Sequence, residues 1–248
     1  MALAVEWFEG FRGSPGGEEG WALLGNLGEA RLVARSRTTR TESGILDLPS
    51  GPVPVHRKIY EYPGWAAGIL GAFRTTFAAP GRARREVRAL RALAAFGFAP
   101  APVALAERRA AGFLVEARLA VRTVEGGTPL DGTAPGGELA RAVGRTVGRV
   151  HAAGLGDLSL SPRNIVAARG PRGEWTVAKV DSGRLRPAAP GGPVQAADLA
   201  DLLAGLEDRW DAAPLAGIRD GYAEAAGRIP EGLDAAMAGA RERRRRRR

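Results

Sequence analysis

Hydrophobic and polar positions along the chain follow two different periods. Runs of β-prone residues, some alternating between apolar and polar or small side chains, predict strands over residues 30–34, 45–48, 53–60, 103–106, 112–117, 165–168 and 175–180. Apolar residues three and four positions apart predict helices over residues 82–96, 138–153, 196–206, 213–227 and 231–240. Strands therefore fill the first half of the chain, and helices fill most of the second half.

A β-hairpin over residues 165–180 is the clearest local signal. Its two β-prone runs flank Gly170-Pro171-Arg172-Gly173, which is a typical turn sequence. Asn164 precedes the first strand and Asp181 follows the second, so we expect both side chains at the same end of the hairpin. Asp157 lies in the loop that leads to Asn164.

These three residues have the chemistry of a phosphoryl-transfer site. One carboxylate, here Asp157, can accept the proton of a substrate hydroxyl. An amide oxygen and a second carboxylate, from Asn164 and Asp181, can hold Mg²⁺ against nucleotide phosphates. Asp181-Ser182-Gly183 also stands where protein kinases have Asp-Phe-Gly. The alternative interpretation is a surface hairpin with polar turn residues.

Lysine is scarce, with two residues against 34 arginines, so each lysine is noteworthy. Lys58 is predicted near the end of strand 53–60. On helix 82–96, Glu86 shares one face with apolar residues such as Leu90, so it points inward and requires a cation. A pair between Lys58 and Glu86 would hold the lysine on the α- and β-phosphates of a nucleotide. Alternatively, Glu86 pairs with an arginine on the surface.

Three further segments have predicted roles. Glu116-Ala117-Arg118 is expected to end a strand and, in a two-lobed protein, to form a hinge whose backbone binds adenine. His151 is at the end of helix 138–153, where the helix dipole favours it, and we expect it to brace the next loop instead of acting in catalysis. Asp198, on helix 196–206, is expected to bind the backbone of a neighbouring loop.

Composition narrows the class of protein. A chain of 248 residues can bury a sizeable core as one large domain or as two lobes. It has no cysteine and only two histidines, which excludes disulfides and thiolate metal sites and argues against a zinc site. It has no apolar run of about 20 residues and no secretory signal, so we expect a cytoplasmic protein.

The two ends of the chain are unusual. Residues 1–29 are rich in glycine and predict a flexible leader, in which Gly25-Asn26-Leu27-Gly28 is the nearest candidate for a phosphate-covering turn. Residues 241–248 hold seven arginines and one glutamate, which is +6 of the formal net charge of +9. Such a block predicts a disordered tail that contacts anionic lipid or, less readily, nucleic acid. Alternatively, the tail is a solvated end without a partner.

Several of these features together resemble a known family. They are Lys58, Glu86, His151-x-x-Gly154, Asp157-Leu158, Asn164-Ile165-Val166, Asp181 and Asp198-Leu199-x-x-Leu202. Their order is similar to that of the lipopolysaccharide core kinases, the Kdo and heptose kinase group, over roughly residues 30–210. The resemblance implies an α+β, two-lobed protein-kinase-like fold, with ATP bound between the lobes. It implies a β-rich N-lobe over 30–118 and a small helical C-lobe over 119–240.

The resemblance also implies roles for individual residues. Lys58 would contact the phosphates of ATP and Glu86 would orient it. Asp157 would be the catalytic base, and Asn164 and Asp181 would bind Mg²⁺. The implied reaction is transfer of the γ-phosphate to a sugar hydroxyl of a glycolipid, by a cytoplasmic protein that is peripheral at the inner membrane.

The chain departs from the pattern of this family in its catalytic loop. Six residues separate Asp157 from Asn164, where the family usually has four, so two residues are expected to loop out. A glycine-rich loop and an Ala-Pro-Glu-like element are not recognisable. The alternatives are therefore a catalytically impaired pseudokinase that binds a nucleotide or a partner, and a binding protein that acts through its arginine tail. Acceptor specificity is expected in the C-terminal helices and in residues 61–80.

Overall fold

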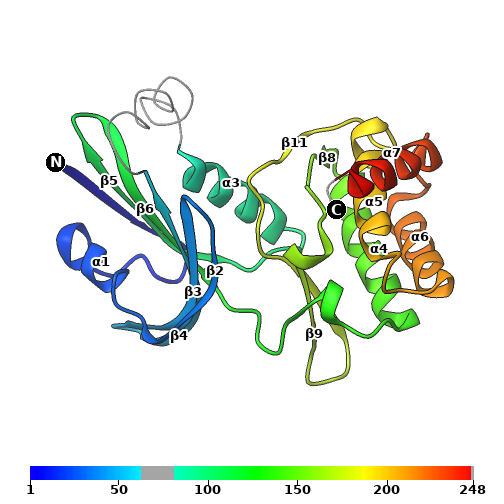
Figure 1. The fold of residues 1–248 in the computed structure, drawn as a ribbon. Coiled ribbons are helices and arrows are strands. Elements are labelled where there is room, and N and C mark those ends of the chain that lie inside the picture. The colour runs from blue at the N-terminus through cyan, green and yellow to red at the C-terminus, as the bar shows by residue number, and fades with distance from the viewer. Residues whose placement is uncertain (63–80, 247–248) are drawn as a thin grey trace. The chain divides into compact units, whose positions relative to one another are not determined.

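The computed structural model describes residues 1–62 and 81–246. It contains two compact units. Unit 1 comprises Met1–Arg91 and Ala101–Thr123, and unit 2 comprises Ala92–Pro100 and Val124–Arg248. Unit 1 is built on a β-sheet and unit 2 is mainly helical (Figure 1), which confirms the predicted α+β class. Residues 61–80, in which acceptor specificity is partly expected, lie from residue 63 on outside the described residues.

The sheet of unit 1 has six strands in the order β1-β5-β6-β4-β3-β2, and every neighbouring pair is antiparallel. The strands are β1 (Ala2–Trp7), β2 (Gly28–Arg35), β3 (Thr39–Leu48), β4 (Gly51–Glu61), β5 (Pro102–Ala110) and β6 (Phe113–Arg122). The strand predicted over 53–60 is thus the central part of β4, and it pairs with β3 on one side and with β6 on the other.

Two helices, α1 (Gly17–Leu23) and α3 (Arg82–Ala94), contact opposite faces of this sheet. Neighbouring residues of a strand point to opposite faces. On β4, the Arg57 guanidinium donates a hydrogen bond to the carbonyl of Leu24, the C-cap residue of α1. The next residue, Lys58, reaches Glu86 on α3. Lys58, which the phosphoryl-transfer hypothesis places on the nucleotide phosphates, therefore lies on the face of the sheet that α3 contacts.

The N-terminal segment is folded, so the prediction of a flexible leader over 1–29 is wrong. Strand β1 pairs with β5 from Ala2↔Arg109 to Trp7↔Ala104. Trp21 of α1 is buried between two arginines, with the guanidinium carbons of Arg108 and Arg118 4.2 and 3.8 Å from its ring centroid. The alternating apolar side chains of β1 and the buried Trp21 order this segment despite its high glycine content.

The candidate hinge also differs from its prediction. Glu116 and Arg118 lie inside β6, which continues to Arg122 and pairs with both β4 and β5 at these positions. Because a central strand uses its backbone groups in two ladders, residues 116–118 have no backbone available for a base. The side chain of Arg118 donates to the carbonyl of Trp21 and to the carboxylate of Glu116, so it serves the packing of α1.

Unit 2 is organised around four helices and the predicted hairpin. The helices are α4 (Gly137–Ala152), α5 (Pro193–Leu206), α6 (Ala212–Ala226) and α7 (Leu233–Arg245). The hairpin strands β9 (Ile165–Arg169) and β10 (Trp175–Lys179) form a sheet with the short β7 (Thr128–Pro129). A second small sheet pairs β8 (Leu155–Gly156) with β11 (Arg186–Pro187). One hydrophobic core joins helices and hairpin.

Helices α4 and α6 approach one another closely through glycines. A Cβ atom on Gly144 of α4 would lie 2.0 Å from the carbonyl oxygen of Ile218 on α6. A Cβ on Gly221 of α6 would lie 2.3 Å from the carbonyl oxygen of Arg141 on α4. Both distances are far below van der Waals contact, so the separation of the two helices requires residues without a side chain.

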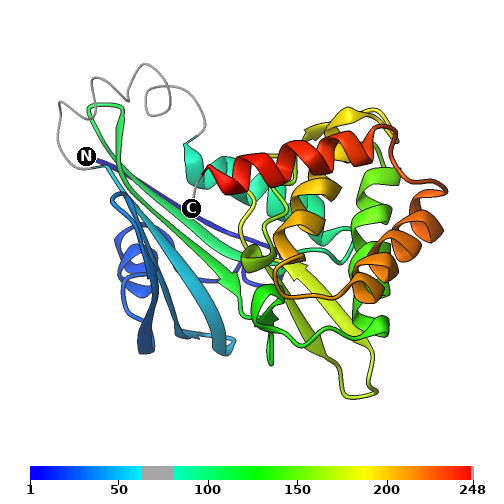
Figure 2. The same ribbon diagram turned by 45° about the vertical axis from the view of Figure 1, so that its right-hand side comes forward.

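The arginine tail is helical where it is described, so the prediction of a disordered tail over 241–248 is wrong for residues 241–245. Helix α7 continues to Arg245 and lies alongside α5 (Figure 2). Three of its arginines form ion pairs with acidic residues on α5 and just after it. The pairs are Arg241–Glu207 at 2.5 Å, Arg243–Asp201 at 2.9 Å and Arg244–Asp208 at 3.3 Å. These carboxylates reduce the repulsion between the arginines.

Candidate active site

The predicted pair between Lys58 and Glu86 is present in unit 1. Strand β4 and helix α3 bring Lys58 Nζ within 2.5 Å of Glu86 Oε1. The hydroxyl of Tyr60, two residues along β4, donates to Glu86 Oε2. Glu86 is buried and Lys58 is 12% exposed, so the carboxylate is fixed from two sides while the ammonium keeps access to solvent. The alternative, a surface pair between Glu86 and an arginine, is not the arrangement observed.

Burial changes the charge state of a histidine close to this lysine. His56 lies two residues before Lys58, and its Nδ1 is 3.1 Å from the hydroxyl of Thr123. Desolvation lowers the pKa of His56, and the positive charge of Lys58 lowers it further. His56 is therefore neutral at pH 7, which leaves Lys58 as the cation of this pair of residues.

Unit 2 brings Asn164 and Asp181 to the same end of the hairpin, as predicted. Ile165, the first residue of β9, pairs with Lys179, the last residue of β10. One step further, the backbone N–H of Val180 donates to the carbonyl of Asn164 at 2.9 Å. The residues that the sequence proposes as ligands of Mg²⁺ therefore flank the last paired positions of the hairpin.

Asp157 follows β8 in a strained loop. Its backbone has a φ of 62°, in the left-handed region that residues other than glycine adopt less readily. Its carboxylate is partly exposed, and Oδ2 lies 3.4 Å from Nε of Arg186 on β11. Ser159, two residues later, also has a positive φ of 51°. Two such residues in one short loop require support from the surrounding structure.

The two extra residues of this loop do not simply loop out into solvent. Leu158 and Leu160 are both fully buried and belong to the core of unit 2. The loop then tightens, because the N–H of Ser161 donates to the carbonyl of Ser159 at 2.8 Å, and a 3₁₀ turn over Pro162–Asn164 follows. Ser159 is exposed between these two buried leucines, so the lengthened loop enters the core on both sides of it.

A buried polar group holds the start of the loop, as the sequence predicted for Asp198. Both carboxylate oxygens of Asp198 accept the backbone N–H of Leu158, at 2.9 and 3.1 Å. His151 is fully buried, with Nε2 3.4 Å from Asp198 Oδ2 and Nδ1 2.9 Å from the hydroxyl of Tyr222 on α6. Burial raises the pKa of the Tyr222 phenol, so this residue stays neutral. His151 thus lies beside the carboxylate that holds the loop.

Sequence reasoning missed two further supports. Gln195 of α5 is buried, and its amide donates to the carbonyls of His151 and Leu155, at 2.7 and 3.1 Å. Lys179 is fully buried beneath the loop. No pattern pointed to the glutamine, whereas the scarcity of lysine was a signal that the second lysine has a particular role.

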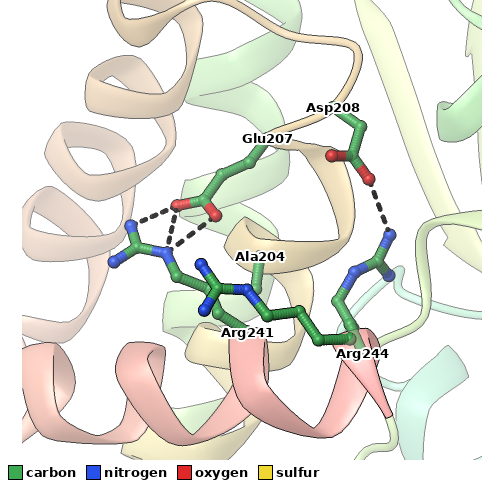
Figure 3. A pocket seen from close by; sticks show the side chains of 6 residues that line it. Ala204, Glu207, Asp208, Arg241 and Arg244 are labelled. Atoms are coloured by element: carbon green, nitrogen blue, oxygen red, sulfur yellow. Dashed lines mark hydrogen bonds and ion pairs between the residues drawn. The ribbon is translucent and has the colours of Figure 1, made fainter. Parts of the chain in front are cut away.

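A pocket of about 290 Å³ lies between α5 and α7 and is lined mainly by ion-paired side chains (Figure 3). Arg241 binds both carboxylate oxygens of Glu207, and Arg244 binds Asp208. The hydrogen bond from Arg241 lowers the pKa of Glu207 and raises that of the arginine. The pocket thus results from the packing of α7 against α5, and it contains none of the predicted site residues.

Among the described residues, no group of three or more His, Cys, Asp or Glu side chains could hold a metal ion. Mg²⁺ commonly takes one or two protein ligands and completes its shell with phosphate oxygens and water. Asn164 and Asp181 offer the oxygen donors that this cation prefers. In the same described part of the chain, no helix is long and apolar enough to span a membrane.

The model of the lipopolysaccharide kinase (Kdo/WaaP) family matches residues 55–221, about two thirds of the chain. The chain belongs to this family. Membership of a kinase family supports phosphotransferase activity for this protein. The matched range contains the Lys58–Glu86 pair, the loop of Asp157 and the hairpin. No curated protein matches the chain.

Two solved structures share the fold. The structure described as WaaP in complex with acyl carrier protein has a TM-score of 0.59 and 18% identity, covering 92% of this chain and 91% of that one. The Rio2 kinase from Chaetomium thermophilum, solved as a complex with ADP, Mg²⁺ and phosphoaspartate, has a TM-score of 0.50 and 15% identity, covering 90% and 70%. At these identities the likeness establishes a kinase-like fold.

Proposed function

We propose that this protein transfers the γ-phosphate of Mg·ATP to a sugar hydroxyl of a lipopolysaccharide core or a related glycolipid. The observation that carries the proposal is the hairpin of unit 2, which brings Asn164 and Asp181 to one end while Asp198 fixes the backbone next to Asp157. Family membership supports the class of acceptor.

Each residue has one chemical task in this reaction. Asp157 accepts the proton of the acceptor hydroxyl as the oxygen attacks the γ-phosphorus. Asn164 and Asp181 hold Mg²⁺, which neutralises charge on the phosphates when it is bound. Lys58 binds the nucleotide phosphates, and Glu86 keeps its ammonium in place. Glu116 and Arg118 take no part, because both serve the sheet and α1.

One observation favours a second candidate, a nucleotide-binding pseudokinase. The carboxylate proposed as the base lies 3.4 Å from the guanidinium of Arg186, in a loop with two strained residues. An arginine that stays on Asp157 would occupy the carboxylate that has to reach the acceptor hydroxyl. Both candidates bind a nucleotide, but only the kinase transfers its phosphate.

Thermal unfolding with ATP, with Mg²⁺ and with both tests the proposal. A ligand at 100 times its Kd adds about 2.7 kcal/mol to the stability of the folded state, which raises Tm measurably. We expect a rise that requires ATP and Mg²⁺ together, and phosphate transfer from labelled ATP to purified lipopolysaccharide. Stabilisation by ATP alone, without transfer, would support the pseudokinase. An unchanged Tm at millimolar Mg·ATP would refute both candidates.

Two substitutions separate the roles of the carboxylates. Asp181→Asn should abolish the part of the Tm shift that depends on Mg²⁺. Asp157→Asn should keep that shift and lose transfer by at least about 10²-fold, in the range expected for a lost general base. Asp201→Asn, on the exposed side of α5, is the matched control and should change neither result. If both site variants transfer phosphate like the wild type, the assignment of the site is wrong.

We further propose that α7 contacts an anionic membrane surface, where a glycolipid acceptor would be found. The side chains of Arg241, Arg243 and Arg244 remain 41–52% exposed although they are ion-paired, so they can still face lipid headgroups. Sedimentation with phosphatidylglycerol vesicles should show binding that weakens with salt. Removal of residues 241–248 should abolish this binding, and unchanged binding would refute the contact.

A further inference from the structure

Lys179 is a fully buried lysine at the end of β10, with a relative exposure of 0%. Lysine is almost never fully buried without partners, because removing an ammonium from water is costly. Arginine outnumbers lysine 34 to 2 in this chain, so a lysine at a fully buried position is unusual. The backbone N–H of Lys179 donates to the carbonyl of Phe98 at 2.8 Å, which fixes the position from which the side chain extends.

The ammonium of Lys179 joins two functional loops. It donates to the carbonyl of Ser159 at 3.3 Å, in the loop that carries Asp157. It also donates to the carbonyl of Asp181, a proposed ligand of Mg²⁺. An ammonium has three donors and can therefore bind several carbonyls at once, which no apolar side chain of this size can do.

We propose that Lys179 is a positioning residue whose ammonium holds the loop of Asp157 and the loop of Asp181 at a fixed spacing. This inference rests on the proposed function, because it assigns the two loops to base and metal. The lengthened loop needs such a support, because Asp157 and Ser159 both have positive φ values. Asp198 binds the N–H of Leu158, the residue between them, and so holds one point of this strained segment.

A purely structural lysine would give a different result on substitution. Replacing a buried charge by an apolar side chain of similar volume is often neutral or stabilising, because the desolvation cost disappears. The carbonyl of Ser159 keeps a second donor, the N–H of Ser161 at 2.8 Å. A positioning role therefore predicts that Lys179→Met keeps the fold and loses catalysis, so that stability and rate change independently.

The experiment compares wild type, Lys179→Met and Thr146→Val. Thr146 is the control because it is also buried and polar, and its hydroxyl bonds within its own helix α4, to the carbonyl of Ala142 and to Arg149. Transfer is measured about 15 °C below the Tm of each protein, so that all are fully folded. We expect Lys179→Met to lower kcat by at least about tenfold, since a displacement of about 1 Å can cost 10²-fold. Thr146→Val should keep the wild-type kcat.

Hydrogen exchange of the unliganded proteins tests the same contact without relying on activity. Lys179→Met should speed amide exchange in residues 158–164 and 181–184, and leave exchange in α4 unchanged. Wild-type exchange in both loops would overturn the inference whatever the activity, as would a wild-type kcat in the folded variant. Absence of transfer in the wild type would instead refute the proposed function, and the exchange data would still decide the role of Lys179.

A chemical rescue completes the test. Because the chain contains no cysteine, Lys179→Cys introduces a single thiol that can be alkylated with 2-bromoethylamine in the unfolded protein and then refolded. The product carries an ammonium at almost the length of lysine. We expect slow exchange in both loops, and kcat, to return with the amine. Alkylation with bromoethane, which adds a similar volume without charge, should restore neither. Equal rescue by both reagents would contradict the inference.

Discussion

The two sets of candidate residues are held in different ways. Lys58 and Glu86 lie on a strand and a helix, and each fixes the other by a direct contact of 2.5 Å. Asp157 lies on an irregular loop with strained backbone, which is held through its peptide groups by Asp198, Gln195 and Lys179. The comparison shows that regular elements place side chains unaided, whereas the loop depends on buried polar side chains from elsewhere in unit 2.

This difference predicts where substitutions are most harmful. In unit 1, a change to the pair should alter nucleotide binding more than folding. In unit 2, removal of Asp198 should alter both folding and activity, because it leaves the buried N–H of Leu158 without its hydrogen bond. Four predictions follow the comparison from the largest expected effect to the smallest.

Asp198→Ala should be the most harmful change. It removes both acceptors of the Leu158 N–H and the negative charge beside His151, in a fully packed region. We expect the free energy of unfolding to fall by about 3 kcal/mol, as for a broken buried charged network, with little transfer remaining. Urea unfolding measures the first effect. Asp201→Ala, on the same helix but exposed, should stay within about 0.5 kcal/mol of wild type. Equal losses at both positions would contradict the role of Asp198.

Leu160→Ala tests whether the lengthened loop is anchored by its extra leucine. Leu160 is fully buried, so the substitution should cost about 2–3 kcal/mol through lost burial and a residual cavity. We also expect a lower kcat in the folded protein, because the loop loses an anchor three residues after Asp157. Leu32→Ala, at a position that is 60% exposed, is the control and should be close to neutral. A neutral Leu160→Ala would mean that the loop does not need this contact.

Glu86→Gln should separate nucleotide binding from folding in unit 1. The amide keeps the shape of the side chain but removes the charge that holds Lys58. We expect the KM for ATP to rise about tenfold, with a loss of unfolding free energy of about 1 kcal/mol. Glu42→Gln, which weakens the ion pair with Arg57 on the opposite face of the sheet, should lower stability without changing KM. A raised KM in both variants would remove the special role of the Lys58–Glu86 pair.

His56 should give the smallest effect, and only in acid. Its pKa is lowered in the folded state, so between that pKa and 6.5 the unfolded chain binds more protons than the folded one. Stability should therefore decrease as the pH falls below about 6.5. His56→Gln should show a shallower decrease between pH 7 and pH 5, measured by urea unfolding at each pH. An identical pH dependence in the two proteins would show that burial of His56 does not affect its titration.

Much of this arrangement could be predicted from the sequence, because periodicity and turn residues determine it. The hairpin, the inward face of Glu86 and the brace by Asp198 all follow from positions within regular elements. The errors occurred where distant residues decide the structure. The arginines of α7 form a helix because acidic residues on and near α5 face them. A prediction made from the block of like charges alone does not take these acidic residues into account.

The remaining errors have equally specific physical causes. Residues 116–118 belong to the interior of β6 because β4 and β5 pair with it on both sides, and a composition shift after residue 118 does not reveal this. The first strand precedes the glycines that suggested a flexible leader, and its alternating side chains match an edge strand. The loop of Asp157 was expected to loop out at two residues, because spacing along the chain does not say which side chains enter the core.

The glycine contacts between α4 and α6 have a consequence for genetics. Neither Gly144 nor Gly221 belongs to the loop of Asp157, yet Tyr222, which contacts His151, directly follows Gly221. A methyl group at either glycine would push α6 away and withdraw the hydroxyl of Tyr222 from His151. A screen for temperature-sensitive alleles should therefore recover changes such as Gly144→Ala or Gly221→Ser. Their phenotype would resemble that of damage to the loop of Asp157.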